Sequence, residues 1–275
     1  MASRLNKVKL KLINSAVIAL SFTMIALCFS SNACLAKEEF SKDQKELMRI
    51  THVSLLNLAD NNQIVDFKAK IETTLHNNNF SNDMKQKLID GLFSAISCCR
   101  SIEGHTTIEY LEFLLSKGAN IQNLDKTKEE KARGLGMYIY GDTEVLEFLI
   151  KLGLDPNGLT NIEEETTAFM MAALKRRIDM CDLLLRYGAD INRVDFDGNN
   201  ALIYALLDDV HEDHTDPYFV DVTNKMVSYL ISKGVNVHKK NNKGKTPYII
   251  ALEFQHRKAA ALIKAAMKNS QRTNQ

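Results

Sequence analysis

The stretch Asp182–Asn192, DLLLRYGADIN, decides the fold because it joins an apolar helix end, a glycine and a turn. Versions of it recur as FLLSKGAN at Phe113–Asn120, FLIKLGLD at Phe148–Asp155 and YLISKGVN at Tyr229–Asn236. The four glycines, at positions 118, 153, 188 and 234, are separated by steps of 35, 35 and 46 residues. A repeated step of this size, with an apolar pair before each glycine, is typical of a stacked repeat array.

Each unit of the array is predicted to contain two helices. Upstream of Gly188, the apolar residues between Met180 and Leu185 form a helical stripe, and glycine can end a helix in the left-handed conformation without a Cβ clash. Further upstream, Thr167 precedes a second apolar run that predicts an earlier short helix. Small residues at Ala172 and Ala173 would let the two helices approach closely.

This pattern resembles the ankyrin repeat, a unit of two helices and a β-turn. The sequence that carries the resemblance is the glycine-stopped second helix of each unit, together with Gly244-Lys245-Thr246-Pro247-Tyr248, Asp195-Phe196-Asp197-Gly198 and Gly141-Asp142. The chain departs from the family pattern where Glu130 and Glu165 replace the turn glycine, where Asn200-Ala201 replaces Thr-Pro, and where Met170, Ile203 and Ile249 replace the histidine. The resemblance covers about residues 85–268.

The resemblance implies an all-α fold, an ankyrin-like α-solenoid of stacked helix-turn-helix repeats with β-turn connections. We expect the array to span residues 83–268 in about five units. Residues 37–82 are predicted to form a degenerate N-terminal helical cap, and residues 269–275 a disordered tail. The long step between Gly188 and Gly234 predicts an insertion at residues 208–222 that leaves the stack as a loop.

The first 36 residues resemble an export signal. Arg4, Lys7, Lys9 and Lys11 precede an uncharged stretch, Leu12–Ala36, with small-residue cleavage sites after Ala33 and Ala36. The alternative is an uncleaved membrane anchor formed by residues 12–36. We therefore expect an exported protein, periplasmic or secreted, that contacts a membrane only through this segment if the segment is retained.

Charge and cysteine content limit the possible functions. Removal of residues 1–36 would change the formal charge from +1 to −3, and a slightly acidic chain argues against nucleic acid as a partner. Of the five cysteines, Cys28 and Cys34 lie in the export segment, so the remaining odd number does not form a disulfide framework. Cys181 takes a helix position that Leu146 and Val227 take in neighbouring units, which predicts a core residue.

The segment 208–216 concentrates aspartate, glutamate and histidine, and could bind a metal ion. A zinc-protease helix needs two histidines four residues apart, whereas His211 and His214 are three apart in a predicted loop. We therefore favour a solvated acidic loop and expect no cofactor. A metal-dependent or metal-regulated protein that uses this loop is the alternative function.

No motif in the sequence indicates catalysis, so we expect a non-enzymatic module that binds a protein partner and acts as a scaffold, an inhibitor or a secreted effector. Turns and adjacent first-helix positions are where ankyrin-like arrays touch partners, although charge runs such as Lys175-Arg176-Arg177 also mark solvated faces. The predicted partner-binding residues are Asn123, Asp125, Arg193, Asp195, Asp197, Asn199, Lys239, Asn241 and Lys243.

Overall fold

The structure, a computed structural model, describes residues 54–59, 61, 63–97, 104–121, 141–161, 164–207 and 216–273. The predicted export segment, residues 1–36, lies outside these ranges. Within them, no helix is long and apolar enough to cross a membrane. The chain forms two compact units, Met1–Asn120 and Ile121–Gln275, which we call unit 1 and unit 2.

Unit 1 contains α3 (Ile64–Leu75), α4 (Asn82–Ser97) and α5 (Gly104–Ser116), and residues 54–59 are also helical. Its core forms around Phe67, which meets Tyr110 edge to face at 4.9 Å between ring centroids. Both rings are fully buried. The predicted cap, residues 37–82, includes α3, and the boundary between the two units falls after Asn120, inside the predicted array of residues 83–268.

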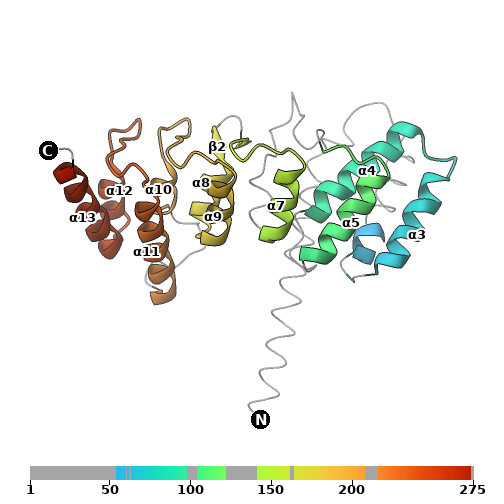
Figure 1. Ribbon diagram of the computed structural model, residues 1–275, viewed down its shortest axis with the longest axis horizontal. Coiled ribbons are helices and arrows are strands. Elements are labelled where there is room, and N and C mark those ends of the chain that lie inside the picture. Colours follow the sequence, from blue (N-terminus) through green and yellow to red (C-terminus); the bar gives the residue numbers. More distant parts are fainter. Residues whose placement is uncertain are drawn as a thin grey trace, which may run out of the picture. The chain divides into compact units, whose positions relative to one another are not determined.

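Unit 2 contains the helix pairs and the short strands of the remaining repeats (Figure 1). In chain order these are α7 (Thr143–Lys151), β1 (Leu159–Asn161), β2 (Thr166–Thr167), α8 (Ala168–Leu174), α9 (Ile178–Arg186), α10 (Ala201–Tyr204), α11 (Pro217–Ser232), α12 (Pro247–Glu253) and α13 (Arg257–Thr273). The helical repeat architecture is confirmed. One connection departs from a plain β-turn, because β1 and β2 pair as an antiparallel hairpin.

Equivalent polar residues start the first helix of each repeat. The side chains of Thr167, Asn200 and Thr246 accept a hydrogen bond from the backbone N–H three residues on, at 3.3, 3.2 and 3.4 Å. An acceptor at this position satisfies one of the N–H groups that a helix leaves without an internal partner. The replacement of Thr by Asn200 therefore keeps the cap.

The core of unit 2 repeats in the same way. The alanines at equivalent positions of the first helices, Ala172, Ala205 and Ala251, are fully buried, which permits the close approach of neighbouring helices. In the second helices, Leu146, Cys181 and Val227 are also fully buried, as the repeat pattern predicted for Cys181. Burial raises the pKa of the Cys181 thiol, so this side chain stays protonated and inert.

Gly188 ends α9 as the sequence predicted. Its φ is 86°, its N–H donates to Leu185 O at 3.1 Å, and the N–H of Ala189 donates to Leu184 O at 2.9 Å. These two bonds form the Schellman arrangement that satisfies the last helical carbonyls. The other three repeat glycines, at positions 118, 153 and 234, also have positive φ.

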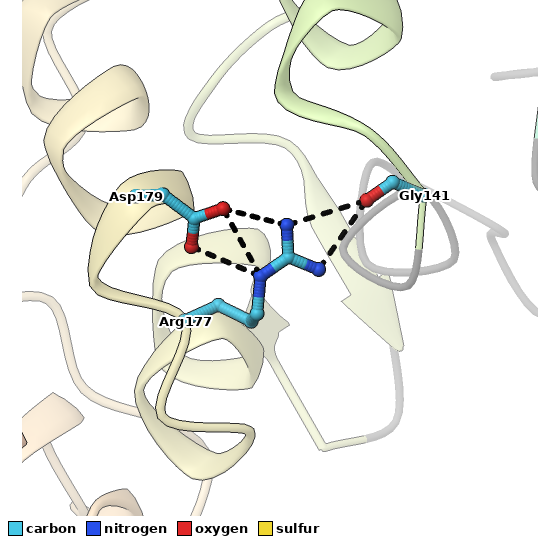
Figure 2. Close-up of polar contacts among 3 residues, drawn as sticks. All are labelled: Gly141, Arg177 and Asp179. Carbon is cyan, nitrogen blue, oxygen red and sulfur yellow. Dashed lines mark hydrogen bonds and ion pairs between the residues drawn. The ribbon is translucent and has the colours of Figure 1, made fainter. Parts of the chain in front are cut away.

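Arg177 connects neighbouring repeats at the turn between α8 and α9 (Figure 2). Its guanidinium donates to Asp179 Oδ2 at 2.7 Å and to the carbonyl of Gly141, 36 residues earlier, at 3.3 Å. The sequence alone did not decide whether the run Lys175-Arg176-Arg177 marks a solvated face. In the structure, Arg177 bonds two neighbouring turns to each other.

Two boundary predictions were wrong. The predicted disordered tail from residue 269 is helical through Thr273, because α13 keeps an inward face to its end, where Ser270 Oγ lies 2.7 Å from the Nε2 atom of His238. The predicted loop at residues 208–222 is helical from Pro217. Residues 208–215 lie outside the described ranges.

The helical part of the insertion packs against the repeat before it. Asp216 caps α11 by accepting from Tyr218 N at 2.9 Å, and Pro217 occupies the first turn. Phe219 is 7% exposed and lies under the guanidinium of Arg176, whose Cζ is 4.1 Å from the ring centroid. Arg176 Nε also donates to Thr223 at 2.8 Å. The first turns of α11 therefore belong to the packed structure.

We expect Gly188→Val to lower the free energy of unfolding by roughly 1–3 kcal/mol, because a β-branched residue is strained at positive φ. A Cβ at this position would meet no atom within 4 Å, so the loss would come from backbone strain alone. Thermal melting checks this, with Gly188→Asn as the control, since asparagine tolerates the left-handed region. Equal destabilisation by both variants would contradict the assignment of strain.

We expect the Arg177–Asp179 contact to contribute less than about 1 kcal/mol, because the carboxylate is half exposed. Its contribution should also depend on pH. The hydrogen bond from Arg177 lowers the pKa of Asp179, so the stabilisation is present at neutral pH and is lost as the pH falls through that lowered pKa. The measurement is thermal melting of the parent and Asp179→Asn between neutral and acid pH. The two melting temperatures should converge on acidification, and a constant gap would contradict the linkage.

Candidate functional site

Three turns project between the helix pairs of unit 2, and we call them finger 1 (residues 155–167), finger 2 (residues 190–200) and finger 3 (residues 236–246). Each starts with the same local bond: the side chains of Asp155, Asp190 and Asn236 accept from the backbone N–H two residues on, at 2.8, 2.8 and 2.9 Å. Such Asx turns fix the direction of the chain as it leaves the helix. All three fingers emerge on the same side of unit 2 (Figure 1).

The bases of the fingers are bonded to one another by side-chain amides. Asn157 donates to Gly188 O at 3.0 Å and accepts from Asp190 N at 2.8 Å, so it bridges fingers 1 and 2. Asn192 is the equivalent residue in finger 2 and accepts from Asn236 N at 2.7 Å. His238 takes this position in finger 3, where it reaches Ser270 on the last helix instead.

The tips of the fingers are also bonded to one another. Phe196 N donates to Glu164 O at 2.9 Å, which joins finger 2 to finger 1. Asn242 N donates to Asp197 O at 2.8 Å, and Asn242 Nδ2 donates to Phe196 O at 2.9 Å, which joins finger 3 to finger 2. Backbone and side chain thus hold the fingers as one surface.

Gly198 permits this close approach. Its φ is 79°, and an added Cβ would lie 2.8 Å from Asn242 Oδ1, 3.1 Å from Asn242 N and 3.2 Å from the Cα of Asn241. Gly244 is the equivalent residue in finger 3, with φ 71° and no atom within 4 Å of an added Cβ. In finger 1 the equivalent residue is Glu165, which adopts φ 52° despite its side chain.

Two of the predicted contact residues are buried inside their own turns. Asp195 is 8% exposed, and its carboxylate accepts from Asn199 N at 2.7 Å and from Tyr204 Oη at 2.9 Å. Asn241 is 9% exposed and accepts from the backbone N–H groups of Lys243 and Lys245. These side chains build the turns, so a partner could reach them only if the turns opened.

The other predicted residues have different surroundings. Asn199 is half-buried and accepts from Asn241 Nδ2 at 3.0 Å, and Arg193 is half-buried and donates to Asn157 O at 3.0 Å. Lys239 is half-buried, while Asp197 and Lys243 are exposed. Asn123 and Asp125 lie outside the described residues.

Sequence reasoning missed an exposed aromatic residue at the tip of finger 2. Phe196 is 68% exposed, although large apolar side chains are normally buried. The signal was present in the sequence, since Phe196 sits in the middle of the turn Asp195-Phe196-Asp197-Gly198, where no helix stripe accounts for it.

The described residues include no group of three or more histidines, cysteines, aspartates or glutamates that could hold a metal ion. Asp216 is the described member of the proposed metal-binding segment, and its carboxylate caps α11. The rest of that segment, residues 208–215, is not described.

Comparison with protein families gives one finding. Residues 136–215 match the family model described as ankyrin repeats (3 copies). The match covers finger 1, finger 2 and the helices α7 to α10, and it ends before α11. Ankyrin repeats bind other proteins and generally act as non-enzymatic scaffolds.

We expect Gly198→Ala to destabilise unit 2 more than Gly244→Ala does. Both substitutions place a Cβ at positive φ, which costs about 1–2 kcal/mol. Only Gly198→Ala also forces finger 3 away, so we expect a further loss of about 1–3 kcal/mol. Chemical denaturation of the two variants measures the difference. Equal losses would mean that the fingers do not approach each other as closely as described.

Proposed function

This chain is an ankyrin-repeat protein, and on that premise we propose that unit 2 binds its protein partner through the tips of fingers 2 and 3. The observation that carries the proposal is the exposed Phe196 on a tip that two neighbouring fingers hold in place. A large aromatic side chain at the centre of a contact is the kind of residue that contributes most to binding free energy.

Rigid display supports this assignment. The N–H of Phe196 donates to finger 1, and its carbonyl accepts from Asn242 of finger 3. The backbone that carries the ring therefore has little freedom to lose when a partner binds, and a preformed surface binds more tightly than a mobile one.

Charged residues near Phe196 would orient the partner on this surface. Asp197 follows Phe196 directly and is exposed, while Lys243 projects from finger 3 and is also exposed. Charged groups of both signs near an aromatic anchor select a partner surface of complementary charge. Of the predicted residues, we retain Asp197 and Lys243 as the primary contacts, with Arg193 and Lys239 at the margin. Asn123 and Asp125 stay predictions.

We further propose that the chain acts outside the cytoplasm, as a periplasmic or secreted scaffold, inhibitor or effector. The support is the sequence of the first 36 residues, in which four cations precede an uncharged stretch that ends in small residues. A chain anchored by residues 12–36 is the competing arrangement, and the mass of the purified protein separates the two. Loss of the first 33 or 36 residues would fit cleavage of an export signal.

The proposed surface is tested by photo-cross-linking in cells that express the full chain. A photoreactive phenylalanine analogue replaces Phe196 in one variant and Val65, a 76% exposed residue of α3, in the control. We expect a defined protein adduct from position 196 and none from position 65. When Asp197→Lys and Lys243→Glu are added to the position-196 variant, we expect this adduct to be lost. Adducts from position 65 alone, or no change on charge reversal, would refute the finger surface.

A further inference from the structure

The last repeat has an exposed apolar face where the preceding repeats have a buried one. Ile249 of α12 is 40% exposed, whereas the equivalent residues of α8 and α10, Met170 and Ile203, are each 1% exposed. Leu252 is 50% exposed, whereas its equivalents, Ala173 and Leu206, are fully buried. The face has the geometry of a helix-packing surface, because the same positions pack inside the stack wherever another repeat follows.

The end of the chain is also strongly basic. Residues 233–275 hold ten of the 35 lysines and arginines of the chain but only one, Glu253, of its 34 acidic residues. α13 contains five cations and no acidic residue. The total charge of the chain is near neutral, so it does not describe the strongly positive charge of residues 233–275.

The cations of α13 lie beside the apolar face. Arg257, Lys264, Lys268 and Arg272 are exposed and share one side of the helix by their spacing. Lys264 Nζ lies 5.7 Å from the ring centroid of Tyr248 on α12, which places the basic side next to the helix that carries Ile249 and Leu252.

Two features of this surface fit a helix as its occupant. On α13, the exposed Ala261 and Ala265 lie between the cations, and small residues allow another helix to come close. Glu253, the last residue of α12, is bonded to Lys245 of finger 3 at 2.7 Å, so the single acidic group of the last repeat is already neutralised. What remains is an apolar stripe beside four exposed cations of α13, and none of these four cations forms an ion pair with another residue that the structure describes.

We propose that the end face formed by α12 and α13 is a second binding surface, and that it takes an acidic amphipathic helix of a protein partner. The apolar side of that helix would cover Ile249 and Leu252 as a following repeat would, and its carboxylates would face the cations of α13. This goes beyond the finger surface and rests on the proposed function only in taking the occupant to be a protein.

The test uses a fluorescent peptide of about 20 residues with leucine on one helical face and alanine and glutamate on the others. A second peptide has lysine in place of every glutamate. We expect saturable binding of the acidic peptide to the full chain by fluorescence anisotropy, at least about tenfold tighter than the basic peptide, and weaker at high salt. Absence of binding, or equal binding of the two peptides, would overturn the proposal.

Matched variants localise the contact. Lys268→Glu and Leu252→Ser should each weaken acidic-peptide binding by about fivefold or more, while Lys70→Glu and Val65→Ser on α3 should leave it unchanged. Lys268→Gln, which removes the charge without reversing it, should give an intermediate affinity, and circular dichroism melts verify that each variant is folded. Equal effects at the α3 positions would place the contact elsewhere and refute the proposal.

Two further results distinguish the occupants and the two surfaces. Cosedimentation with vesicles of phosphatidylcholine and phosphatidylserine, abolished by Lys268→Glu, would assign the face to an anionic lipid surface and overturn the protein-helix proposal. The position-196 cross-link should persist in Lys268→Glu. Loss of peptide binding with that cross-link intact separates a failure at the end face from a failure of the finger surface.

Discussion

Unit 2 depends on one constraint: the chain must change direction in the same way where each second helix ends and the next finger begins. A single repeat cannot bury the apolar faces of two short helices, so successive repeats must present those faces in the same orientation. Gly188 meets this requirement by taking φ 86°, which directs the chain out of α9 and into finger 2. The Asx turn at Asp190 then fixes the base of the finger, and Asn192 receives the backbone of the next one. A different ending of the helix would shift the finger and every bond that it makes to its neighbours.

The polar side chains of this array are of two kinds. Some bond neighbouring elements of the stack, and others are exposed and available for contact with a partner. Arg176 illustrates the first kind, since its backbone is left-handed at φ 57° and its guanidinium covers Phe219 and bonds Thr223. The contacts offset the strain of a non-glycine residue in that region. Asp197 and Lys243 illustrate the second kind, because their side chains are exposed while their neighbours hold the turns. Only some of the polar turn residues are therefore available to a partner. The bonded residues beside them hold these available residues in fixed positions.

Much of the fold could be predicted from the sequence because its signals are local. Each signal is a short motif that recurs from repeat to repeat. Examples are the helix-ending glycines at 118, 153 and 188, the helix starts at Thr167 and Thr246, and the buried position of Cys181. Two kinds of contact were not predicted: hydrogen bonds between repeats and hydrogen bonds inside the turns. Arg177 bonds a carbonyl 36 residues away and Asn242 one 46 residues away, and residue type alone does not specify such partners. Asp195 and Asn241 were predicted as contact residues from their positions in the turns, but their side-chain polar groups are bonded inside those turns. The Asp216-Pro217 helix start was a local signal that sequence reasoning passed over.

The fingers of unit 2 form one surface, held together by the backbone hydrogen bonds at their tips. Hydrogen exchange at the amides of Phe196 and Asn242 tests it most directly, because both N–H groups donate to carbonyls of the neighbouring finger. We expect these two amides to exchange slowly, with protection approaching that of the amides inside α9. Exchange at the rate of an open loop, while α9 stays protected, would show instead that the fingers move independently.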